Sequence, residues 1–287
     1  MQNQQISFMT APKVELEELK NLFFQLCTKT SNSSYKSCYI EKSNQKNKED
    51  FIGIDKIKQN LNCIKDKNLN SIYLMGAEPL MHPDFNQILR LCLKVCHTTI
   101  LTSGVMINDK KARFLRKIDD ESKFETIYRI SLDSTDEIKN DQYRFRGSFR
   151  KALSAIFALL KYEFNPIISV VNYENKTKQE LFEEFSSFFL KKGFELDDIN
   201  LKVIPYFPPM NPNSQEISHQ EDFDRIDCKT SRVISQKGVY SCPMLIDDYR
   251  AHLGTSLDNS SRVNYLDCEK CSICTSLNQK VLVNDWM

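Results

Sequence analysis

The chain alternates between short apolar runs and longer segments whose apolar residues recur at helical spacing. A short apolar run bounded by turn residues predicts a β-strand, and helical spacing predicts an amphipathic helix. The predicted strands cover residues 21–27, 71–75, 98–104, 126–133, 166–172 and 199–207. The predicted helices between them cover residues 53–66, 84–96, 108–118, 147–162 and 178–193.

Strands that alternate with helices through short connections predict an α/β fold with a parallel sheet and outer helices, hence a barrel or a partial barrel. The alternation is lost after the stretch FPPMNPNS, where cysteines become frequent. We therefore divide the chain into an N-terminal segment (1–18), a barrel (19–207) and a cysteine-rich C-terminal region (208–287). In such barrels the chemistry takes place at the C-terminal ends of the strands.

Composition narrows the class of protein further. The formal net charge of +1 gives no long-range attraction to nucleic acid or to an anionic membrane, so we expect neither partner. The chain contains no apolar run of the roughly 20 residues that a membrane span requires, and its first residues lack the apolar core of a signal peptide. We therefore expect a cytoplasmic protein, in which 10 cysteines indicate metal binding or catalysis over disulfides.

Glycines and polar residues gather directly after the predicted strands. Gly76 follows the second strand and Gly104 the third, and each alone also fits a simple turn. The polar residues near the same strand ends are Glu78, Thr102, Ser103, Ser131 and Asp133. A glycine lets the backbone approach a ligand closely, and the strand ends of one barrel meet at one mouth. We therefore expect these side chains to point into a common mouth.

The last part of the chain concentrates the thiols. Cys268, Cys271 and Cys274 are spaced by two residues each, and Cys228 and Cys242 precede them. Two sulfurs in CxxC spacing can reach one metal, and four thiolates satisfy either zinc or a [4Fe-4S] cluster. From these residues alone, a zinc site and a [4Fe-4S] cluster are supported about equally. The thiols that fall in a predicted helix and are expected to pack in the core are Cys92 and Cys96.

Several stretches resemble one known family, the radical S-adenosylmethionine (SAM) enzymes. SIYLMGAEPLMHPDF resembles the second strand and GGEPL-type turn of these enzymes, with Ala77 in place of the second glycine. TILTSG resembles their third strand, and YRISLDSTDEIKNDQYRFRGSFRKAL resembles their fourth strand and the Arg-Gly turn after it. The resemblance spans nearly the whole chain in the same order. It implies a partial (β/α)6 TIM-like barrel with a cysteine-rich C-terminal extension, holding a [4Fe-4S] cluster and SAM.

The resemblance also implies a SAM-binding site at the predicted mouth. Glu78 would accept a hydrogen bond from the SAM amino group, and the backbone around Gly76 would lie along the methionine moiety. Arg146, in the stretch FRG, would pair with the SAM carboxylate as a guanidinium fork, with Arg144 as the competing arginine. The residues implied to face the ribose hydroxyls are Ser131 and Asp133. A cap or turn is an equal alternative for Asp133.

The end of the first strand departs from the family pattern. That pattern is C-x3-C-x2-C followed by an aromatic residue, and its three thiolates leave one iron open for SAM. Here the loop LCTKTSNSSYKSCYI contains Cys27 and Cys38 as its thiols. With Cys38 as the third ligand, the other two positions hold Ser31 and Tyr35. With Cys27 as the first ligand, the other two positions hold Ser31 and Ser34. The sequence alone therefore does not decide whether Cys27 and Cys38 hold a second [4Fe-4S] cluster.

The tail resembles that of the SPASM and twitch members of the family, which carry auxiliary iron–sulfur clusters. The stretch CKTSRVISQKGVYSCPMLIDDYRAHLGTSL carries this resemblance. It favours one auxiliary [4Fe-4S] cluster over zinc in the C-terminal region. The implied ligands are Cys228, Cys242, Cys268, Cys271 and Cys274.

Two functions of different class follow from these observations. The first is a radical SAM enzyme that takes electrons from a reductant such as flavodoxin or ferredoxin and cleaves SAM to a 5′-deoxyadenosyl radical. Its substrate is unidentified, and the tail group suggests a peptide. The second is a scaffold that lacks the SAM-cleaving cluster and serves as a binding or regulatory protein with the C-terminal cluster alone. The polar strand ends favour the first function, and the missing thiolates favour the second.

Overall fold

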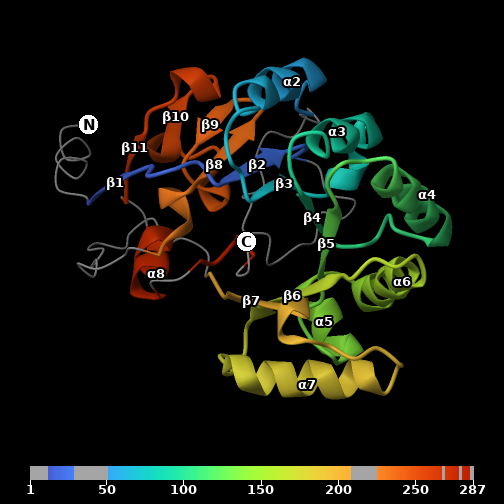
Figure 1. Cartoon of the computed structure of the whole chain (residues 1–287). Coiled ribbons are helices and arrows are strands. Elements are labelled where there is room, and N and C mark those ends of the chain that lie inside the picture. Colours follow the sequence, from blue (N-terminus) through green and yellow to red (C-terminus); the bar gives the residue numbers. More distant parts are fainter. Residues whose placement is uncertain (1–11, 29–50, 208–224, 267–268, 278–279, 285–287) are drawn as a thin grey trace.

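A curved parallel sheet forms the centre of the computed structural model, which describes residues 12–28, 51–207, 225–266, 269–277 and 280–284 (Figure 1). Its barrel strands are β2 (Asn21–Gln25), β3 (Ser71–Met75), β4 (Thr98–Thr102), β5 (Thr126–Ser131), β6 (Ile167–Asn172) and β7 (Leu201–Pro205). They pair in chain order and are all parallel. The predicted α/β partial barrel is therefore confirmed, and each predicted strand end lies within two residues of the observed one.

The helices that connect these strands lie on the convex side of the sheet, as Figure 1 shows for α2, α3, α4, α6 and α7. Their bounds are α2 (Ile54–Asn62), α3 (Phe85–Cys92), α4 (Asp109–Asp120), α6 (Ser148–Lys161) and α7 (Lys178–Leu190). The five predicted helices are confirmed. A further short helix, α5 (Glu137–Tyr143), was not predicted because its stretch EIKNDQY is almost entirely polar.

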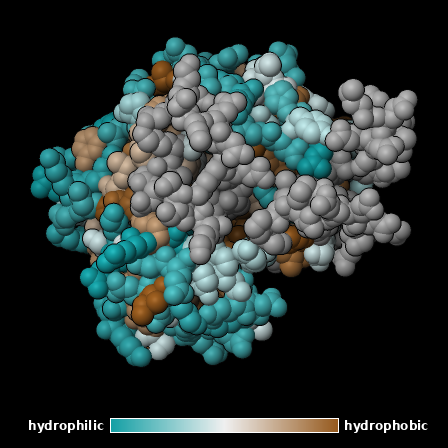
Figure 2. Space-filling view, turned by 180° about the vertical axis from the view of Figure 1, so that it is seen from behind, coloured by the Kyte–Doolittle hydropathy of each residue, from teal (hydrophilic) through white to brown (hydrophobic). Residues whose placement is uncertain are grey.

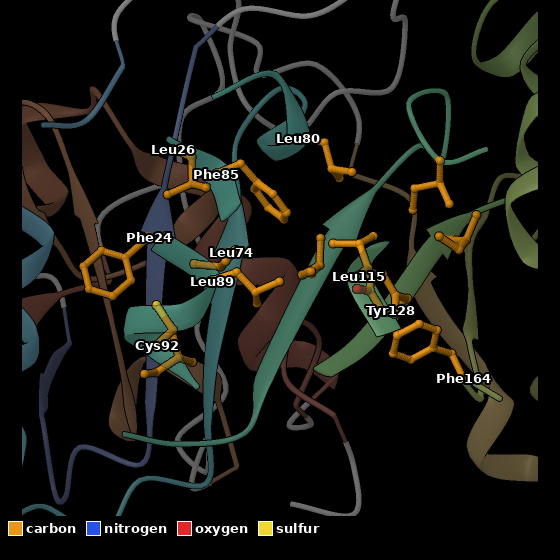
Figure 3. Close-up of a cluster of buried hydrophobic side chains, with 14 of the residues drawn as sticks. Phe24, Leu26, Leu74, Leu80, Phe85, Leu89, Cys92, Leu115, Tyr128 and Phe164 are labelled. Atoms are coloured by element: carbon orange, nitrogen blue, oxygen red, sulfur yellow. The ribbon is translucent and has the colours of Figure 1, made fainter. Parts of the chain in front are cut away.

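The main hydrophobic core lies between the sheet and the outer helices. Figure 3 shows Phe24, Leu74 and Leu89 packed together in this layer, with Cys92 beside them. Their side chains are fully buried, since each has 0% exposure. Close packing of this layer holds the strands in a fixed register, and the strand ends that carry the candidate site are therefore held in fixed positions.

The C-terminal region continues the same sheet. Strand β8 (Ser231–Ser235) pairs in parallel with β2, and β9 (Gly238–Tyr240) and β10 (His252–Gly254) follow in antiparallel order. Strand β1 (Lys13–Glu15) pairs with β11 (Val263–Tyr265) in a second, small sheet, and α8 (Glu269–Leu277) follows. The boundary predicted near residue 208 lies outside the described residues. The division into three regions therefore stays a prediction.

The outer surface is mixed in character. Figure 2 shows a largely hydrophilic face in which hydrophobic residues occur in small groups. None of the helices in the described ranges combines the length and the apolar character needed to cross a membrane.

Candidate functional site

Glu78 lies in the turn after β3, and its buried carboxylate joins the ends of β3 and β4. Its Oε1 accepts a hydrogen bond from Thr102 Oγ1 at 2.6 Å and a longer one from the Leu80 amide at 3.4 Å. Its Oε2 accepts from the Ser103 hydroxyl at 2.6 Å and from the Ser103 amide at 3.1 Å. Burial raises the pKa of Glu78, and these hydrogen bonds oppose the rise. Thr102 and Ser103 thus converge on Glu78.

The turn that carries Glu78 packs directly against Cys27 at the end of β2. A Cβ on Gly76 would lie 2.6 Å from the Cys27 carbonyl oxygen and 3.0 Å from its amide nitrogen, so only glycine fits here. The Ala77 amide donates to the Cys27 carbonyl at 3.0 Å. The buried Cys27 thiol donates to the Glu78 carbonyl at 3.1 Å. The predicted ligand Cys27 therefore lies beside the predicted SAM-binding turn.

The other candidates for the first cluster lie outside the described residues. These are Cys38 and the positions Ser31, Ser34 and Tyr35. Ile52 is among the first described residues after this gap, and its carbonyl accepts a hydrogen bond from His82 Nε2 at 2.9 Å. His82 is four residues after Glu78, so this bond links Ile52 to the same turn. A first cluster on Cys27 and Cys38 stays a prediction.

Asp133 follows β5, and protein donors already occupy its carboxylate. Its Oδ2 lies 2.7 Å from Arg144 Nη1, in an ion pair whose aspartate side chain is fully buried. Its Oδ1 accepts from the Val171 amide at 2.9 Å. Arg146 is exposed and lines a surface pocket with acidic residues of α5. The structure thus brings Arg144 to Asp133, and it leaves Ser131 half-buried at the end of β5. The roles of Ser131, Asp133 and Arg146 toward SAM stay predictions.

The concave side of the barrel holds the C-terminal segment, defined here as residues 280–284. Asp227 accepts three amide hydrogen bonds from this segment, at 2.9, 2.8 and 3.5 Å. From the barrel strands, Arg129 donates to the Leu282 carbonyl and Lys202 donates to the Lys280 carbonyl at 3.1 Å. The valine and leucine side chains of the segment are buried in a second hydrophobic cluster. The segment therefore fills the barrel interior from the open side.

Four of the five predicted tail ligands line one pocket. The turn η3 (Asp227–Lys229) supplies the first thiol, and the loop after β9 supplies the second. Helix α8 supplies the other two. These residues are Cys228, Cys242, Cys271 and Cys274. Burial raises the pKa of Cys228 to about 11, and the charge of Arg232 opposes this rise. Cys268, the fifth predicted ligand, lies outside the described residues.

The donors of this pocket fit an iron–sulfur cluster in kind and in number, because four thiolates are the usual ligands of a [4Fe-4S] centre. Within the described ranges no three His, Cys, Asp or Glu side chains converge closely enough to hold a single metal ion. Four thiolates are also the ligands of structural zinc sites. The preference for a cluster over zinc therefore follows from the family resemblance and stays a prediction.

The cysteines of the outer helices do not join either site. Cys92 and Cys96 are buried in the main core, and burial raises the pKa of both thiols, that of Cys96 to about 11. Their predicted role in core packing is confirmed. Cys63 instead donates to Asp258 Oδ2 at 3.0 Å and links α2 to the C-terminal region.

Five buried charged residues around these sites are not among the residues predicted from the sequence. They are Arg129, Lys202, Asp227, Arg232 and Lys270. A signal for three of them was present in the pattern. Arg129, Lys202 and Arg232 each interrupt a short apolar strand, and a charge inside such a strand indicates a buried polar partner. Nothing in the local sequence marks Asp227.

A comparison with protein families matches residues 36–184 to the Radical SAM superfamily. Among curated proteins, the antilisterial bacteriocin subtilosin biosynthesis protein AlbA of Bacillus subtilis (strain 168) is 28% identical over 121 residues, which is 42% of this chain and 26% of that protein. A probable GTP 3',8-cyclase of Methanocella arvoryzae is 25% identical over 142 residues, 48% of this chain and 43% of that protein. The matches thus span less than half the length of these curated relatives.

Solved structures share the fold at low sequence identity. Native anSMEcpe with bound AdoMet superimposes with a TM-score of 0.61 at 15% identity, covering 91% of this chain and 84% of that chain. SuiB of Streptococcus suis bound to S-adenosylmethionine gives a TM-score of 0.61 at 15% identity, covering 83% and 63%. Coverage of this extent includes the C-terminal region as well as the barrel.

Proposed function

This chain belongs to the radical SAM superfamily, and on that premise we propose that it binds SAM at the strand ends and cleaves it reductively in order to modify a peptide. When bound, a [4Fe-4S] cluster would supply the electron that splits SAM into methionine and a 5′-deoxyadenosyl radical. An external reductant such as flavodoxin or ferredoxin would supply that electron. The residues of this chain would bind SAM, orient it and keep water from it.

The observation that carries the proposal is the charge state around Glu78. Its carboxylate is 1% exposed and accepts hydrogen bonds from neutral donors alone among the described residues, two of them hydroxyls. A buried carboxylate is stabilised chiefly by a cationic partner. Hydroxyls can rotate away, so Glu78 can exchange one of them for the ammonium group of SAM. The site thus has a place for an amino acid cation.

The remaining SAM contacts follow the sequence predictions. The backbone at Gly76 would lie along the methionine moiety, in the turn that the missing side chain allows to pack against Cys27. Ser131 and Asp133 would face the ribose, and Arg146 would pair with the SAM carboxylate after a movement of its exposed side chain. Arg144 is the alternative, since it already lies buried at the end of α5.

The C-terminal pocket would hold one auxiliary [4Fe-4S] cluster. The supporting observation is that four thiols from separate segments line it. Cys268 would be the fifth thiol of this region. A peptide is the proposed substrate class because AlbA is named for the biosynthesis of a bacteriocin, and two solved structures of anSMEcpe contain bound peptides.

A second candidate function rests on the surroundings of Cys27. Its thiol is 1% exposed and donates to the Glu78 carbonyl, so it takes part in packing the turn. A protein that used this thiol for packing alone would lack the first cluster. It would bind SAM or a peptide and keep the auxiliary cluster, as a binding or regulatory protein.

Anaerobic reconstitution with iron and sulfide separates the two functions. The enzyme is expected to bind about eight irons per chain, as two [4Fe-4S] clusters, and to release 5′-deoxyadenosine when SAM and dithionite are added. About four irons without release of 5′-deoxyadenosine would refute the enzyme and support the second function. A Cys38→Ala variant should lower the iron content by about four if the first cluster forms. Bound zinc in place of iron would refute the auxiliary cluster.

A further inference from the structure

Lys270 places a buried ammonium group on the wall of the four-cysteine pocket. The residue is 7% exposed and lies on α8, directly before Cys271. Its Nζ donates to the Met244 carbonyl at 3.0 Å. No carboxylate of the described residues lies within ion-pair distance of it. An ammonium group has three donors, so Lys270 has capacity left for an anion in the pocket.

Arg232 places a second buried cation next to the same site. It is 0% exposed, the largest of the fully buried side chains. Its guanidinium donates to the carbonyls of Cys228 at 2.9 Å, Ser231 at 2.8 Å and Arg262 at 2.7 Å. All three partners are neutral oxygens. The charge of Arg232 is therefore solvated by the backbone and is not neutralised by a carboxylate within the described ranges.

Buried cations without anionic partners are unfavourable. Removing an ion from water is unfavourable even after the surroundings relax, and a fold normally offsets this with an opposite charge. The acidic groups near the pocket are already engaged. Asp227 accepts amides of the C-terminal segment and lies near Lys202. Asp248 pairs with Arg250 at 2.6 Å and interacts with Lys270 through its charge, without an ion pair between them. Among the described residues, the surplus of positive charge therefore calls for an anion that the described carboxylates do not supply.

We propose that Lys270 and Arg232 are the counter-cations of the metal–thiolate centre in this pocket and that they raise its reduction potential. This inference rests on the auxiliary cluster of the proposed function. A cluster bound by four thiolates carries negative charge, and reduction adds one more. Nearby buried cations stabilise the reduced state more than the oxidised state, because attraction grows with the charge of the centre and burial keeps it unscreened. The pocket is thereby built to accept an electron.

A redox titration followed by EPR spectroscopy tests the inference on the full-length, iron-reconstituted protein. A Cys27→Ala/Cys38→Ala background restricts the signal to the auxiliary cluster. Lys270→Gln should lower the ratio of reduced to oxidised cluster about tenfold at a fixed potential, a shift of about 59 mV for a one-electron couple. Lys270→Arg keeps the positive charge, so the reduction potential of its cluster should remain near that of the parent protein. Arg232→Gln should also lower the reduction potential. Arg232→Lys keeps the positive charge and should retain most of the parent potential.

Lys237 provides the matched control. It lies in the same region, pairs with Asp247 at 2.8 Å and has a side chain that is 42% exposed, so solvent screens its charge. Lys237→Gln should leave the potential unchanged. If Arg232→Gln fails to fold, the comparison of Lys270→Gln with Lys270→Arg still tests the inference. Equal potentials in the parent and Lys270→Gln proteins, with the cluster bound, would overturn the inference and leave the proposed function intact. A parent protein that binds no iron–sulfur cluster would overturn both.

Discussion

Arg144 Nη1 lies 2.7 Å from Asp133 Oδ2, and the two side chains form a buried ion pair at the end of β5. Arg144→Ala would leave the Asp133 carboxylate buried without a cation. Removing one partner of a buried pair costs about 3–5 kcal/mol. We therefore expect Arg144→Ala to lower the free energy of unfolding by about this amount, as measured by urea denaturation.

Arg146→Ala is the matched control, because the two arginines are two positions apart and Arg146 is exposed. We expect it to change the free energy of unfolding by about 0.5 kcal/mol or less. If Arg146 pairs with the SAM carboxylate, the same variant should bind SAM more weakly in calorimetry. Unchanged SAM binding by Arg146→Ala, with a loss in Arg144→Lys, would assign the carboxylate contact to Arg144.

Gly76→Ala tests the close approach of the turn after β3 to Cys27. The added Cβ would lie 2.6 Å from the Cys27 carbonyl oxygen, and that backbone atom cannot move aside without shifting the end of β2. We expect a loss of about 1–3 kcal/mol in the free energy of unfolding. Gly53→Ala is the control, since a Cβ there meets nothing within 4 Å, and we expect it to cost about 1 kcal/mol or less. Similar losses in both variants would contradict the steric argument.

The barrel could be predicted from the sequence because its signals are local. Each barrel strand is a short apolar run between turn residues, so strands such as SIYLM are visible without any knowledge of their partners. Glu78 and Cys27 could be named for the same reason, since they lie at strand ends. The cysteine pocket could be anticipated from spacing and from the family resemblance, and four of its five thiols are brought together.

The rest could not be predicted because it depends on contacts between distant parts of the chain. The pairing of β8 with β2 joins residues more than 200 positions apart, and no local pattern reports it. The choice between Arg144 and Arg146 depends on which side chain faces inward at the irregular end of α5. The position of Lys270 and Arg232 beside the cysteine pocket depends on the folded structure and has no local signal in the sequence.

Cys271→Ala, made in a Cys268→Ala background, should remove the auxiliary cluster, because the three thiols that remain cannot complete a set of four thiolate ligands. We expect the reconstituted protein to lose about four irons per chain, measured by a colorimetric iron assay. Cys92→Ala is the control, since Cys92 is a fully buried thiol in the main core, away from the pocket. It should lose stability without losing iron. Iron loss in Cys92→Ala, or full iron in Cys271→Ala, would contradict the assignment.

Glu78→Gln tests the burial of the uncompensated carboxylate. Burial raises the pKa of Glu78 above its ordinary value of 4.5, so the folded chain binds this proton more tightly than the unfolded chain does. The contribution of Glu78 to stability is therefore fully present below about pH 4.5 and is lost as the pH rises through the folded-state pKa. Relative to the wild type, Glu78→Gln should become more stable between pH 5 and pH 8 in urea denaturation. It should also bind SAM more weakly. A stability difference that does not change with pH would contradict this.

Leu282→Ala tests whether the C-terminal segment is an integral part of the barrel. Leu282 is 2% exposed, packs in the interior cluster and has its carbonyl bound by Arg129. Truncating a buried leucine costs about 2–5 kcal/mol, because transfer and cavity effects add. Leu277→Ala is the control at the end of α8, where the leucine is 40% exposed and the expected cost is about 0.5 kcal/mol or less. Equal unfolding midpoints for the two variants would mean that the segment leaves the barrel in solution. A large loss for Leu282→Ala alone would show that the segment packs in the barrel interior.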